Sequence, residues 1–86
     1  MLSAEDALVF ITDSKKFLEP YKAYGKMITD GIAQLDKLEA LVRSKSYAEA
    51  YMMVCAMCDQ ISTYRGFVPT LAENLEKTRE ILKGLC

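Results

Sequence analysis

Residues 46–65 read SYAEAYMMVCAMCDQISTYR, and this stretch decides the fold class. It opens with Ser46 followed three positions later by Glu49, the pattern of a helix capping box. Apolar residues then recur at the three- and four-residue spacing of a helix, with no alternation typical of a strand. We therefore predict a helix over residues 47–65, with Gly66 as a left-handed stop.

This predicted helix is more apolar than one flank of a small bundle requires. At about 100° per residue, one broad face carries Tyr47, Ala50, Tyr51, Val54, Met57, Cys58 and Ile61. Met52 and Ala56 fall on the opposite, otherwise polar face, while Met53 and Tyr64 lie at its edge. One interpretation is a central helix that neighbours cover on two sides. The other is a helix that also supplies an exposed patch for association.

The second interpretation defines the candidate interaction residues Tyr51, Met52, Met53, Ala56 and Tyr64. Methionine suits such a patch because its unbranched side chain adapts to irregular surfaces. Tyrosine suits it because its ring offers a large contact area with a polar tip. We expect these residues to contact a protein partner, a second copy of the chain, or both.

Two segments precede this helix. Ser3, followed by Glu5 and Asp6, is a typical start for a helix over residues 4–18, because acidic side chains in the first turn favour the helix dipole. A second apolar stripe predicts a helix over residues 20–43. Pro20 either begins this second helix or kinks one long helix that includes both segments.

Pro69 marks the start of a last helix, over residues 69–84, whose leucines recur in a regular 4-3-4-3 rhythm. Short polar turns between helices favour antiparallel neighbours. The predicted fold class is all-α: a small up-and-down antiparallel bundle of three to four helices over residues 4–18, 20–43, 47–65 and 69–84.

Length and composition set limits on the core. A chain of 86 residues has room for one domain, which we assign to residues 1–86. A domain of this size buries only about 60% of the surface that its unfolded chain exposes, so its stability margin is small. The hydrophobic fraction of 51% still permits a core and leaves apolar surface that a partner can cover.

Charge and hydropathy argue against two classes of partner. Eleven basic and twelve acidic residues give a net charge of −1 without a basic stripe, so we expect no nucleic-acid partner. No apolar run approaches the ~20 residues of a membrane span, so we expect no membrane partner. Glu5 and Asp6 stand where a signal peptide would carry positive charge, and none is expected.

Catalytic and metal-binding residues are not apparent. The absence of histidine removes the commonest general base. Three cysteines do not form a secreted disulfide framework, so we expect a reducing, cytoplasmic location. Cys55 and Cys58 form a Cys-x-x-Cys pair inside the predicted helix, but only Cys86 offers a third thiol for a zinc site that needs four ligands. We expect no catalytic residue, no metal and no cofactor.

These observations favour a non-catalytic protein–protein interaction or assembly module, such as an adaptor, a small inhibitor or an immunity-type factor. We expect it to act as a homodimer, because association would bury the surplus apolar surface. The alternative is a thiol-dependent metal-binding or redox protein that uses the Cys55 and Cys58 pair.

Overall fold

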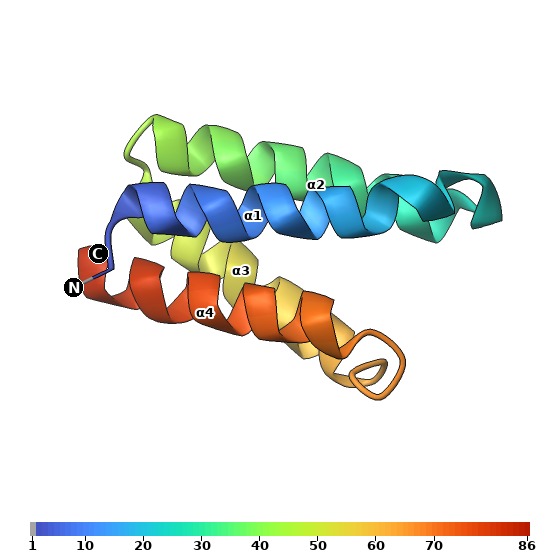
Figure 1. Cartoon of the computed structure of the whole chain (residues 1–86). Helices are drawn as coiled ribbons and strands as arrows, with labels where there is room; N and C mark the ends of the chain where they lie inside the picture. Colours follow the sequence, from blue (N-terminus) through green and yellow to red (C-terminus); the bar gives the residue numbers. More distant parts are fainter. Residues whose placement is uncertain (1) are drawn as a thin grey trace.

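The computed structural model of the chain describes residues 2–86. It contains α1 (Ala4–Leu18), the short 3-10 helix η1 (Glu19–Tyr24), α2 (Lys26–Arg43), α3 (Tyr47–Ser62) and α4 (Pro69–Leu85). Successive α-helices run antiparallel in an up-and-down bundle, and residues 2–86 contain no strand (Figure 1). The all-α fold class is therefore confirmed. None of the helices in this described part combines the length and apolar character of a bilayer span.

The first and last helices have nearly the predicted bounds. At the start of α1, the Asp6 carboxylate accepts a hydrogen bond from the backbone N–H of Ser3 at 2.7 Å. That bond satisfies an amide that lies outside the helical hydrogen-bond pattern. Pro69 begins α4, where its missing amide removes no helical hydrogen bond.

The predicted helix over residues 20–43 is wrong at its start. Pro20 neither begins α2 nor kinks one long helix, because it lies in the first turn of η1. Gly25 then adopts φ 140° and ψ 178°, a backbone conformation essentially restricted to glycine. Helical geometry cannot continue through such a residue, so α2 begins only at Lys26.

The predicted capping box at the start of α3 is also wrong. The Ser46 side chain makes no capping hydrogen bond, and its ψ of 61° departs from the extended backbone of a typical cap. The preceding turn determines this geometry. Lys45 has a φ of 63°, its amide donates to Val42 O at 3.1 Å, and the Ser46 amide donates to Leu41 O at 2.9 Å. This Schellman motif ends α2 and allows α3 to begin after three residues.

At its other end, α3 stops at Ser62, three residues before the prediction. Turns follow, in which the Tyr64 amide donates to Ile61 O and the Phe67 amide donates to Tyr64 O, both at 2.8 Å. Gly66 does not adopt a positive φ, so the predicted left-handed stop is wrong. The helix ends in these hydrogen-bonded turns instead.

The core contains the apolar stripes of all four α-helices. α1 packs most extensively against α4, whereas α2 and α3 contact each other least among the neighbouring helices. The fully buried apolar side chains include Ile11, Leu38, Val54 and Leu82. Two buried hydroxyls, Ser14 and Thr78, donate within their own helices to Phe10 O and Asn74 O at 2.8 Å. They need no partner on another helix.

Two hairpins make up the bundle: α1–α2, with η1 between its helices, and α3–α4. Within residues 2–86, every side-chain ion pair lies inside one hairpin. Lys15 joins α1 to α2 through Asp36 and Glu39, and Arg65 pairs with Glu76 of α4. Between the hairpins, Lys77 Nζ lies 5.4 Å from the Phe10 ring centroid. Apolar packing therefore provides most of the adhesion between the hairpins.

Candidate interaction surface

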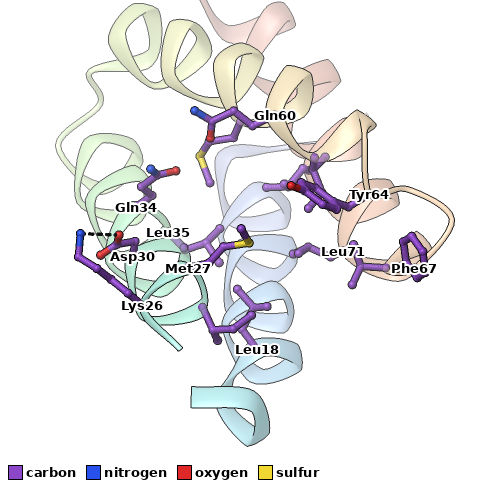
Figure 2. A pocket seen from close by; sticks show the side chains of 16 residues that line it. Leu18, Lys26, Met27, Asp30, Gln34, Leu35, Gln60, Tyr64, Phe67 and Leu71 are labelled. Carbon is purple, nitrogen blue, oxygen red and sulfur yellow. Dashed lines mark ion pairs between the residues drawn. The ribbon is translucent and has the colours of Figure 1, made fainter. Parts of the chain in front are cut away.

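An apolar groove lies where the two hairpins diverge, at the end of the bundle away from both termini (Figures 1 and 2). Its volume is about 660 Å³. Every α-helix and the connection between α3 and α4 contribute to it. The lining residues are Leu18, Lys26, Met27, Ile28, Asp30, Gly31, Gln34, Leu35, Met57, Gln60, Ile61, Tyr64, Phe67, Val68, Leu71 and Leu75.

The floor of the groove is the edge of the hydrophobic core. Five side chains are buried in the core and also line the groove: Leu18, Leu35, Met57, Leu71 and Leu75. Their positions follow from the apolar stripes that pack the hairpins together, so the floor is fixed by the fold. Any apolar group that enters the groove therefore continues the core outwards.

Exposed apolar side chains form the two lips of the groove, on opposite sides in Figure 2. Met27, on the first turn of α2, is one lip and is largely exposed. Tyr64 and Phe67 form the other, with 46% and 85% of their surface exposed. Apolar side chains of this size are usually buried. Gathered around an apolar floor, these three residues make a continuous patch.

Local geometry holds the aromatic lip in place. Tyr64 and Phe67 belong to the same hydrogen-bonded turn, and the Val68 amide donates to Tyr64 O at 3.1 Å. Arg65 donates to the Glu76 carboxylate, which raises the pKa of the Arg65 guanidinium above its ordinary value. The turn is therefore tied to α4 and presents both rings on the same side of the bundle.

The charge on the groove lining is balanced. Lys26 and Asp30 are its only formally charged residues, and they pair with each other at 3.4 Å, as Figure 2 shows. The neutral amides Gln34 and Gln60 complete the polar part, from α2 and α3. A strongly charged ligand finds no unpaired opposite charge in this lining, whereas an apolar one meets little that must be desolvated.

The structure separates the candidate interaction residues predicted from sequence. Tyr64 lines the groove, and the other four do not. Met52, with 73% of its surface exposed, and Ala56 are exposed on the outer face of α3. Tyr51 and Met53 are half-buried and pack against the core. The exposed members of this set therefore lie in two regions, the groove and the outer face of α3, and of these two the groove is the one that combines a cavity with several large apolar side chains.

Sequence reasoning missed Met27 and Phe67, although both carried a signal. Met27 lies next to the apolar stripe of α2 and not within it, and Phe67 lies between Gly66 and Val68, just before Pro69, in a segment without helical periodicity. An apolar residue outside the stripe does not face the elements against which its helix packs. The pattern alone does not say whether another helix covers it.

The cysteines do not form a cluster. Cys55 is half-buried, Cys58 is buried and Cys86 is exposed, and all three are free thiols. Burial raises the pKa of the Cys58 thiol, with the nearby Arg79 charge opposing that effect. A raised pKa lowers the fraction of reactive thiolate. In residues 2–86, no group of three or more histidine, cysteine, aspartate or glutamate side chains is arranged to hold a metal ion.

Comparison with protein families, with curated proteins and with solved structures finds no match for this chain. The class of molecule defined by its geometry is a small all-α bundle with an apolar groove between two helical hairpins. Its function must be inferred from that groove.

Proposed function

We propose that this chain is a non-catalytic protein–protein interaction or assembly module, and that the groove and its lips are its contact surface. One observation carries the proposal: Met27, Tyr64 and Phe67 are exposed around an apolar cavity of about 660 Å³. Exposed apolar patches on soluble proteins mark interaction sites, because covering them gains about 25 cal/mol per Å². Adaptors, small inhibitors and immunity-type factors all act through contacts of this kind.

Protein is the partner class that this lining fits best. Its only charges, Lys26 and Asp30, neutralise each other, so phosphate-rich nucleic acid gains nothing there. Apolar and aromatic side chains meet their counterparts on the floor and lips, and Gln34 and Gln60 can hydrogen-bond to backbone groups. Protein interfaces commonly have this composition, with an apolar centre and a polar rim.

The test compares two exposed apolar positions in the protein's own cell. Tagged wild-type chain, Tyr64→Glu and Met52→Glu are each purified under native conditions, and the intact complexes are weighed by native mass spectrometry. A carboxylate at position 64 would have to be desolvated in the groove. We expect Tyr64→Glu to weaken the affinity for the partner at least tenfold, which corresponds to about 1.4 kcal/mol, and so to lower the yield of the complex.

Met52→Glu is the matched control, because Met52 is exposed on the outer face of α3 and does not line the groove. It should leave the complex intact, and circular dichroism should show that both variants remain helical. Recovery of bare monomer alone from the wild type would contradict the proposed function. Loss of the complex in Met52→Glu but not in Tyr64→Glu would move the contact to the outer face of α3.

A further inference from the structure

We infer that the groove is filled by a second copy of this chain, and that Phe67 of each copy inserts into the groove of the other across a two-fold axis. This inference rests on the proposed function, whose contact surface it uses. It commits to the occupant, which the function alone leaves open. Three properties of the groove support it: shape, charge and area.

The shape is complementary to itself. A two-fold interface uses the same patch on both subunits, so that patch must contain both a projection and a cavity that receives it. Phe67 is the projection, because it is the most exposed large apolar side chain in residues 2–86 and lies at the edge of the groove. The groove is the cavity, and its volume of about 660 Å³ is in the size range of typical ligand pockets. Met27 lies across the groove from Phe67 (Figure 2).

The charge is also complementary to itself. Lys26 and Asp30 have opposite signs and are one helical turn apart on α2. A two-fold axis that passes over α2 between these two residues places Lys26 of each copy opposite Asp30 of the other. Ion pairs can then form between the copies as well as within each copy. The net charge of −1 per chain adds little repulsion. A fatty acid, by contrast, would leave its carboxylate without a free cation in the lining.

The area required is modest. A standard interface takes about 800 Å² from each partner, or about one seventh of the 5427 Å² that this chain exposes. Phe67, with 85% of its surface exposed, and Tyr64, with 46%, supply part of this area.

The hairpins are also suited to admitting a ring. Because no side-chain ion pair joins them within residues 2–86, a small outward shift of one hairpin disturbs mainly non-directional apolar contacts, together with the contact between Lys77 and the Phe10 ring. The aromatic lip moves with α4, to which Arg65 and Glu76 connect it. The groove can therefore widen without losing an ion pair.

The experiment measures the mass of the purified 86-residue chain by sedimentation velocity, from dilute to concentrated solution. A reducing agent is present because the exposed Cys86 thiol could otherwise form disulfides between copies. We expect the wild type to change from monomer to dimer as its concentration rises. Phe67→Glu should weaken the dimer at least a hundredfold, and Met52→Glu, which alters another largely exposed apolar site outside the groove, should not.

A charge exchange tests the axis. Lys26→Asp alone places like charges opposite each other in both copies and should weaken the dimer about tenfold, and adding Asp30→Lys should restore it. Circular dichroism of each variant distinguishes loss of folding from loss of association. A wild type that stays monomeric at every concentration, a dimer indifferent to Phe67→Glu, or a charge exchange that fails to restore association would overturn the inference.

The two proposals fail in different ways. If purified chain is monomeric while the cellular complex still depends on Tyr64, the groove binds a different protein, and only the second-copy inference is wrong. If the cellular complex is also missing, the proposed function falls with it.

Discussion

The two ends of the bundle differ in how the hairpins meet. At the closed end, which holds both termini and residues 44–46, three residues connect α2 to α3 and the hairpins lie close together (Figure 1). At the open end, η1 with Gly25 and residues 63–68 form longer connections, and the groove separates the hairpins. Residues 44–46 join the two hairpins at the closed end, whereas each connection at the open end joins two helices of the same hairpin, so the chain does not hold the hairpins together there.

Side-chain size contributes to this difference. Ala7 and Ala50 are fully buried in the half of the bundle nearer the closed end, where small side chains let helix backbones approach. Leu18, Met57 and Leu71, at the open end, are larger and keep a little exposure to the groove. We infer that the closed end supplies most of the stability and the open end supplies the binding surface, a division common where binding elements come from less stable regions.

The largest effect should come from a leucine truncation at the closed end. Leu82→Ala removes a fully buried side chain and should lower the free energy of unfolding by about 3–5 kcal/mol, because the lost contacts leave a cavity. Leu71→Ala, at the floor of the groove, should cost about 2 kcal/mol, because its cavity opens to the groove and can fill with water. Urea denaturation of the two variants measures both values. Equal losses would show that the two ends are equally tight.

The sequence predicts the first and last helices better than the connections between helices. The predicted residues 4–18 match α1, and residues 69–84 miss the end of α4 by one. Both have regular apolar stripes and clear start signals, so local information is sufficient. The region from Pro20 to Gly25 is different, because a proline and a glycine are each compatible with several backbone conformations. Which conformation forms depends on how α2 packs on α1.

The residues of the candidate site are even harder to predict from local sequence. Tyr64 could be identified because it follows an unusually apolar helix, and it does line the groove. Met27 and Phe67 could not, because their exposure depends on which helices lie opposite them in space. Whether Met52 also contacts a partner stays a prediction, which the matched variants above are designed to test.

An intermediate effect is expected at Gly25, where the open connection turns back into α2. With φ at 140° and ψ at 178°, Gly25→Ala should cost about 1–3 kcal/mol of stability. The cost comes from the backbone alone, because an added Cβ would meet nothing within 4 Å. Gly66→Ala is the control, since Gly66 also has open space but no positive φ, and it should change stability by about 0.5 kcal/mol or less. Thermal unfolding of both variants gives the comparison, and similar shifts would show that the conformation of Gly25 is not what matters.

The smallest effect on stability is expected for the ion pairs that Lys15 forms within the first hairpin. Lys15 Nζ lies 3.1 Å from Asp36 Oδ1 and 3.2 Å from Glu39 Oε1. The hydrogen bond to Asp36 is the main cause that raises the pKa of Lys15, with burial opposing it and Glu39 adding to it. Lys15→Met keeps the apolar stem and removes the charge, so it should cost about 1 kcal/mol or less near neutral pH.

The pH dependence of that cost has a definite sign. Because the folded-state pKa is higher than the unfolded one, the charged form of Lys15 favours the folded state. Its contribution is complete below the unfolded value of about 10.4 and disappears as pH rises through the folded value. The difference in urea midpoint between wild type and Lys15→Met should therefore be constant through neutral pH and shrink in strong alkali. A difference that grows in alkali would show that the ammonium is poorly accommodated between α1 and α2. Apolar packing would then provide most of the adhesion within the first hairpin, as it does between the two hairpins.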